Sequence, residues 1–150
     1  MKTIKLQNQL IVPVFSFLQG AVLKGKATRG RNQLMKRLEE KSKEFNESLT
    51  DMRKEYFVLD KDGELEVQNG EYIFKDEANK DELNKELSEK MKELNEEEIE
   101  IQFGEYSTKY EALFKALDEY EEALSGQEAL GYNELMDAYE ANEDKKEEEK

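Results

Sequence analysis

The chain has 150 residues, a formal net charge of −14 at neutral pH, and no His, Cys or Trp. Without Cys it has no disulfide scaffold, thiolate zinc site or thiol nucleophile, and without His it has no Ser-His-Asp or Cys-His catalytic arrangement. Its length fits one domain with a sizeable core. The composition therefore favours a protein that binds another macromolecule over an enzyme.

The charge is distributed unevenly along the chain. The first forty residues carry eight Lys and Arg against two Glu, whereas the remaining 110 carry fifteen Lys and Arg against thirty-five Asp and Glu. An acidic body repels nucleic-acid phosphates and anionic lipids, and it attracts basic protein surfaces. We therefore expect a protein partner, with no direct nucleic-acid contact and no membrane association.

Two elements are predicted near the N-terminus. Residues 3–6 alternate between polar and apolar side chains, which predicts a short strand. The apolar run over residues 10–23 resembles a signal peptide only superficially, because three polar residues separate it from the N-terminal lysines. It is also shorter than the roughly 20 residues that span a bilayer. A buried helix beginning around residues 9–12, with Pro13 in its first turn, is the better interpretation.

A basic segment, Lys-Gly-Lys-Ala-Thr-Arg-Gly-Arg, follows over residues 24–31. Its two glycines and its threonine predict a loop that leads into a helix N-terminus. The candidate partner-binding residues are its four cations, Lys24, Lys26, Arg29 and Arg31. We favour internal pairing of these cations with the acidic helices of the same chain, and contact with a protein partner is the main alternative. The segment has no aromatic residue that could stack on a base.

The long amphipathic helix is predicted from Arg31 to about Leu59, where apolar residues recur at steps of three, four and seven. Asp-Lys-Asp-Gly at residues 60–63 predicts the turn that ends it. We expect this helix to pack against the first, third and fourth helices. Its apolar stripe could serve a dimer as readily as an internal core, so the oligomeric state stays open.

A β-hairpin is predicted over residues 65–74, because Asn69-Gly70 at its centre favours a type I′ turn. A two-residue loop pairs Val67 with Tyr72 and Leu65 with Phe74. These four side chains are then expected to share one face.

The C-terminal half alternates helices with one strand. Apolar spacing predicts a helix over residues 76–95, a strand over 98–103 that pairs with residues 3–6, and a helix over 107–124. The sequence of residues 125–128 fits a capping box that opens a fifth helix. That helix is expected to end near Tyr139, with Leu130, Leu135 and Met136 as contacts.

The predicted fold class is α+β and mostly helical. It has about five helices including the long amphipathic one, a β-hairpin and a small two-stranded sheet. Residues 1–141 form a single acidic domain, and residues 142–150 form a disordered charged tail.

Two acidic patterns are candidate cation sites. Asp60 and Asp62 suggest part of a calcium loop, but the outer ligand positions do not fit, and a turn is favoured. Glu98 and Glu100 lie on one face of the predicted strand and could hold a divalent cation weakly. A solvated acidic face is favoured there, and we expect no cofactor.

The sequence Lys-Leu-Gln-Asn-Gln-Leu at residues 5–10, with the basic segment leading into a long acidic helix, resembles a known family. These are small uncharacterised proteins, with a domain of unknown function, of tailed phages and prophages of Gram-positive bacteria. The resemblance covers nearly the whole chain. It implies production in the cytoplasm of an infected bacterium, and it implies no activity, cofactor or catalytic residues.

We therefore expect a non-enzymatic phage accessory protein that binds and antagonises a host protein, such as a defence factor or a nucleic-acid enzyme. The acidic helices could act there by imitating DNA. The alternative is a role in virion or tail assembly, as a minor tail component or a chaperone for one.

Overall fold

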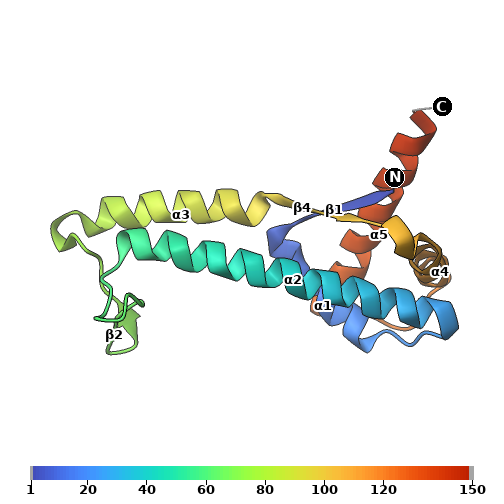
Figure 1. The fold of residues 1–150 in the computed structure, drawn as a ribbon, viewed down its shortest axis with the longest axis horizontal. Helices are drawn as coiled ribbons and strands as arrows, with labels where there is room; N and C mark the ends of the chain where they lie inside the picture. Colours follow the sequence, from blue (N-terminus) through green and yellow to red (C-terminus); the bar gives the residue numbers. More distant parts are fainter. Residues whose placement is uncertain (1, 149–150) are drawn as a thin grey trace. The chain divides into compact units, whose positions relative to one another are not determined.

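The computed structural model describes residues 2–148, with side chains described up to Asn142. The fold is α+β and mostly helical, as the sequence predicts (Figure 1). Within the described residues it has five α-helices and two separate pairs of antiparallel strands. In chain order these elements are β1 (Thr3–Gln7), α1 (Ile11–Gly20), α2 (Gly25–Tyr56), β2 (Val67–Gln68), β3 (Glu71–Tyr72), α3 (Lys80–Glu96), β4 (Glu98–Gln102), α4 (Ser107–Asp118) and α5 (Gly126–Glu148).

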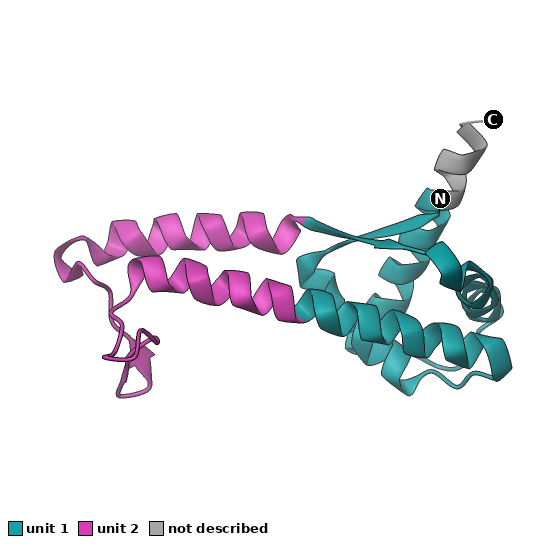
Figure 2. Cartoon of the chain, in the orientation of Figure 1, with its two compact units in different colours: residues 1–42, 98–150 teal, residues 43–97 magenta. Residues whose placement is uncertain are grey.

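The chain divides into two compact units (Figure 2). Unit 1 comprises residues 1–42 and 98–150, and unit 2 comprises residues 43–97. Unit 1 is therefore discontinuous in sequence, and helix α2 contributes residues to both units. These units are compact groups of contacts and do not test the domain boundary. The single domain over residues 1–141 therefore stays a prediction.

The sheet of unit 1 pairs as predicted. Strands β1 and β4 run antiparallel, with Ile4 opposite Ile101 and Leu6 opposite Ile99. Because side chains alternate along a strand, these apolar residues share one face. Three of the four are buried and Ile99 is half-buried against the same core.

Helix α1 packs closely against α5. A Cβ built on Gly131 would lie only 2.1 Å from the carbonyl oxygen of Pro13, so this approach requires glycine. Pro13 is the third residue of α1, where its missing N–H removes no intrahelical hydrogen bond. On α5, Leu135 and Met136 are buried as predicted, but Leu130 is 45% exposed, so its predicted contact role is wrong.

One apolar cluster forms the core of unit 1 and draws side chains from α1, α2, α4, α5 and both strands. Leu34 and Leu38 of α2 join it, which confirms the predicted packing of the long helix against the first and fourth helices. Several aromatic rings belong to this cluster. The rings of Phe114 and Tyr139 are stacked with centroids 4.2 Å apart, and Phe103 lies 6.0 Å from Phe114.

Helix α4 ends at Asp118, six residues before the predicted end at Leu124. Four acidic residues lie between Asp118 and Glu122, and negative charge at a helix C-terminus opposes the helix dipole. Tyr120 still packs on the core beyond the helix, with its ring edge-to-face against Phe17 at 5.6 Å.

Helix α5 is longer than predicted: it continues past the expected end near Tyr139 to Glu148. The residues that follow Tyr139 are mostly good helix formers. Asn142, assigned by sequence to the disordered tail, is half-buried and accepts a hydrogen bond from the Thr3 backbone N–H at 3.2 Å. The tail prediction also covers residues 149–150, which lie outside the described residues.

The predicted capping box at residues 125–128 does not form. Helix α5 begins at Gly126, whose φ of +56° suits glycine. Among the described residues, the Ser125 side chain makes no hydrogen bond; only its carbonyl oxygen accepts one, from the Ala129 N–H at 3.4 Å.

In unit 2, helix α2 ends at Tyr56, three residues before the predicted end at Leu59. Phe57 and Leu59 instead form isolated β-bridges with Phe74 and Leu65, respectively. The predicted pairing of Leu65 with Phe74 is therefore wrong, because each of them takes a partner from the segment that follows α2.

The centre of the hairpin is confirmed. Asn69 and Gly70 have φ values of +53° and +80°, as a type I′ turn requires, and Val67 lies opposite Tyr72. The helix that follows, α3, begins at Lys80 after a short 3₁₀ turn rather than at residue 76. Its Leu87 is buried with Tyr56 and Phe57, the three residues that form the core of unit 2.

Candidate protein-binding surfaces

The basic segment is helical, not a loop. Helix α2 already begins at Gly25, so Lys26, Arg29 and Arg31 lie in its first two turns, and Lys24 directly precedes it. Lys26 and Arg29 are three residues apart and are therefore neighbours on the helix surface.

The two glycines of the basic segment predicted a loop, but Gly30 lies within helix α2 and has a packing role. A Cβ at Gly30 would lie 2.3 Å from the Lys109 carbonyl oxygen, so this glycine permits the close approach of α2 to α4. Gly25, with a φ of +53°, is the glycine that sets the chain direction where α2 begins. Sequence alone does not separate a close-packing glycine from a turn glycine.

The four candidate cations differ in what they contact. The Arg31 guanidinium is half-buried and donates to the Ala21 carbonyl oxygen at 2.7 Å, directly after the end of α1. Lys24, Lys26 and Arg29 are exposed. None of these three forms an ion pair with an acidic side chain in the part of the chain whose side chains are described. The favoured internal pairing is therefore not seen there, and Arg31 has a structural contact.

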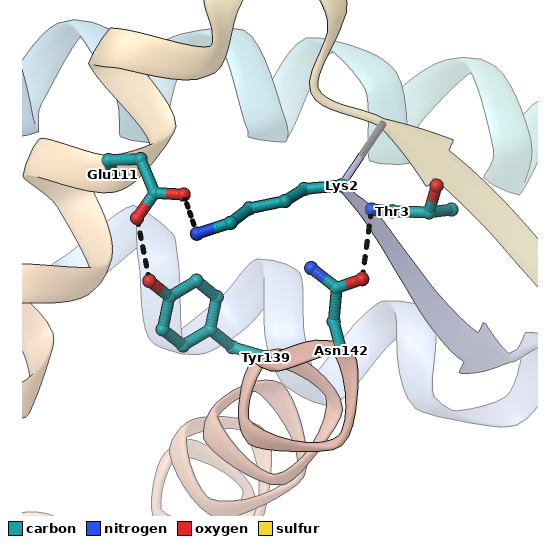
Figure 3. Close-up of polar contacts among 5 residues, drawn as sticks. All are labelled: Lys2, Thr3, Glu111, Tyr139 and Asn142. Atoms are coloured by element: carbon teal, nitrogen blue, oxygen red, sulfur yellow. Dashed lines mark hydrogen bonds and ion pairs between the residues drawn. The ribbon is translucent and has the colours of Figure 1, made fainter. Parts of the chain in front are cut away.

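An ion pair between distant parts of unit 1 involves a different lysine. Lys2 pairs with Glu111 of α4, and the other oxygen of Glu111 accepts a hydrogen bond from the Tyr139 hydroxyl at 2.7 Å (Figure 3). Beside them, Asn142 accepts its hydrogen bond from Thr3 (Figure 3). These contacts tie the start of β1 to α4 and α5, so we assign them a structural role. Sequence reasoning missed them because they join residues more than 25 positions apart.

The hairpin of unit 2 exposes apolar side chains. Val67 is 57% exposed and Tyr72 is 41% exposed on strands that lie side by side. The centre of the Tyr72 ring lies 5.2 Å from that of Phe57, so Tyr72 contacts the core of unit 2 while much of it meets solvent. Unit 2 carries eighteen Asp and Glu against nine Lys and Arg, a net charge of −9. The sequence predicted a shared face for the hairpin but not its exposure.

The candidate cation sites have simpler explanations. One carboxylate oxygen of Asp60 accepts backbone N–H groups from Asp62 at 2.8 Å and Glu64 at 3.0 Å, which forms the predicted turn. Glu98 and Glu100 are exposed on β4. Among the described residues, no group of three or more acidic side chains is placed to hold a metal ion.

No helix in the described part of the chain has both the length and the apolar character needed to cross a bilayer. No curated protein and no solved structure matches the chain. A family model described as "Protein of unknown function (DUF1617)" matches residues 3–148, which is nearly the whole chain. The protein therefore belongs to this family of unknown function.

Proposed function

We propose that the protein acts by binding another protein rather than by catalysis, and that Lys24, Lys26 and Arg29 contact an acidic surface on that partner. One observation carries the proposal: these cations are exposed and have no acidic partner among the described side chains. Cations left unpaired on one surface are available for charge-assisted contacts with a complementary surface.

The partner we propose is a host protein, and the binding antagonises it in the cytoplasm of a phage-infected Gram-positive bacterium. The phage context rests on the resemblance of residues 5–10 and of the basic segment to phage and prophage proteins. The absence of His and Cys supports binding over catalysis, because it removes the commonest general base and the thiol nucleophile.

The test is affinity capture from a lysate of infected host cells, with the full chain as bait. The test variant is Lys24→Gln/Lys26→Gln/Arg29→Gln. A matched control, Lys5→Gln/Lys36→Gln/Lys115→Gln, removes the same charge from three other exposed lysines of unit 1. We expect the wild type and the control to recover the same host protein, and the test variant to lose it while keeping its helical circular dichroism.

Binding kinetics then identify the contact. For the wild type, association should slow as salt rises from about 0.1 M, where the Debye length is about 10 Å, to about 1 M, where it is about 3 Å. If the control and test variants lose the same amount of affinity for the host protein, Lys24, Lys26 and Arg29 are not the contact. Recovery of phage tail components alone would favour the assembly role. Binding of duplex DNA at physiological salt would reject a purely protein-binding function.

A further inference from the structure

A groove of about 650 Å³ runs between α2 and α3 within unit 2. Its apolar lining comes from Met52 of α2 and Leu94 of α3, both half-buried. Its other lining residues are Lys90, Glu93, Glu96 and Glu97. A lining that combines two apolar residues with charged ones suits an amphipathic segment, which has an apolar face and a charged face. The four charged lining residues are called the rim below.

The apolar residues of this unit continue along both helices at helical spacing. Phe45, Leu49 and Met52 follow each other on α2, and Leu87, Met91 and Leu94 follow each other on α3. Of these six only Leu87 is buried, and the other five are half-buried. Two helices alone cannot cover such rows, whereas a third helix packs its own row of side chains between them. Methionine in the lining adapts to different side-chain shapes.

The rim has a net negative charge. Lys90 is its one cation, and its ammonium already lies 3.8 Å from carboxylate oxygens of both Glu55 and Glu86 and 5.1 Å from the centre of the Tyr56 ring. The interaction with the Tyr56 hydroxyl is the main reason that the pKa of Lys90 is raised, and these neighbours hold its positive charge in place.

The three rim glutamates are not compensated in this way. Glu93, Glu96 and Glu97 are exposed, and none of them forms an ion pair with a side chain that the structure describes. They also lie at the C-terminal end of α3, whose last turn contains no basic residue, so the helix dipole adds to their negative potential.

We infer that this groove binds a basic amphipathic helix of a partner protein, with its apolar side chains over Met52 and Leu94 and its lysines or arginines against Glu93, Glu96 and Glu97. Charge selects this occupant over a second copy of the chain, because a second unit 2 would bring another net charge of −9. The groove shares no residue with the Lys24, Lys26 and Arg29 surface, so either assignment can fail without the other.

The probe is a fluorescent synthetic 18-residue peptide of leucine and lysine with leucine at helical spacing. A scrambled peptide of the same composition controls for charge alone. We expect the full chain to bind the amphipathic peptide as a saturable 1:1 complex, and amide NMR shifts to cluster around Met52 and Leu94. Glu93→Gln/Glu96→Gln/Glu97→Gln should weaken binding about tenfold or more, because three charge-assisted contacts are lost.

The matched control is Glu77→Gln/Asp81→Asn/Glu82→Gln, which removes the same charge near the opposite end of α3. It should weaken binding by about threefold or less, since only the long-range attraction changes. Leu94→Ser should also weaken binding, and the charge variants decide the question if Leu94→Ser fails to fold. Equal effects of the two triple variants, or equal binding of the scrambled peptide, would overturn the assignment. So would a dimer in sedimentation that Leu94→Ser dissociates, because the occupant would then be a second copy.

Discussion

Unit 1 and unit 2 differ in how much apolar surface they bury. Among the residues whose side chains are described, the core of unit 1 contains seventeen buried apolar residues, including Phe17, Phe103 and Phe114, whereas that of unit 2 contains only Tyr56, Phe57 and Leu87. Burial is the main favourable term in folding, so local stability should be much higher in unit 1. The groove lies in the unit with the smaller core, where the partner helix proposed above would add apolar contacts.

The largest effect is expected in the core of unit 1. Leu113→Ala should lower the free energy of unfolding by roughly 2–5 kcal/mol, because Leu113 is fully buried and its removal leaves a cavity. Urea denaturation followed by circular dichroism measures the change. A loss below about 0.5 kcal/mol would mean that the core tolerates cavities and that the difference between the units is small.

The close contact of α1 and α5 should respond to the addition of one methyl group. Gly131→Ala should destabilise unit 1 by about 1–3 kcal/mol, because the new Cβ meets the backbone of Pro13. Gly20→Ala is the matched control in the same helix pair, since its nearest neighbour is the Glu128 side chain at 3.9 Å. It should change stability by less than about 0.5 kcal/mol. Similar values for both variants would contradict the close approach of these helices.

In unit 2 the same type of truncation should have a smaller effect. Leu87→Ala should cost about 2 kcal/mol or less, because the few surrounding side chains can relax into the space. Native-state hydrogen exchange measures this locally, and α3 amides should exchange faster than α4 amides already in the wild type. Equal protection of the two helices would remove the proposed difference in stability between the units.

The smallest effect concerns pH. The Tyr132 hydroxyl donates a hydrogen bond to the Leu117 carbonyl oxygen at 2.7 Å, and burial, followed by the charges of Asp118 and Glu140, raises the pKa of Tyr132. The folded state therefore holds this proton more tightly than the unfolded state does. The stabilisation is complete below the unfolded pKa of about 10 and is lost as pH rises through the folded pKa.

Tyr132→Phe should accordingly cost about 1 kcal/mol at pH 8, and this cost should shrink by pH 11. Denaturation of both proteins at the two pH values measures it. Tyr72→Phe, at a 41% exposed residue on the hairpin, is the control and should change the free energy of unfolding only slightly. A cost for Tyr132→Phe that stays constant with pH would argue against the raised pKa of Tyr132.

Local patterns in the sequence predicted most elements correctly. Alternation located β1 and β4, and Asn69-Gly70 located the hairpin turn, because both signals depend on residues adjacent in the chain. The ends of helices were less predictable. Helix α2 ends early because Phe57 and Leu59 pair with residues farther along the chain, and such competition is not visible in a local window.

The candidate surfaces were only partly predictable. The sequence located the four cations of the basic segment. It did not indicate that one of them, Arg31, donates a hydrogen bond to the Ala21 carbonyl oxygen. The groove was not predicted at all, because Met52 and Leu94 lie far apart in sequence and become neighbours only when α2 and α3 pack. Their helical spacing indicated an apolar stripe on each helix. Such spacing does not predict how much of the stripe stays exposed to solvent after the helices pack.

The contact between Thr3 and Asn142 has a consequence for the order in which the protein can form during synthesis. Strand β1 is made about a hundred residues before its partner β4, and its contact on α5 is made later still. The contacts of unit 2 lie within a single segment of 55 residues and can form earlier. The unit with the smaller core can therefore be completed before unit 1, because Ile4 and Leu6 lack their partners on β4 until that strand has been made.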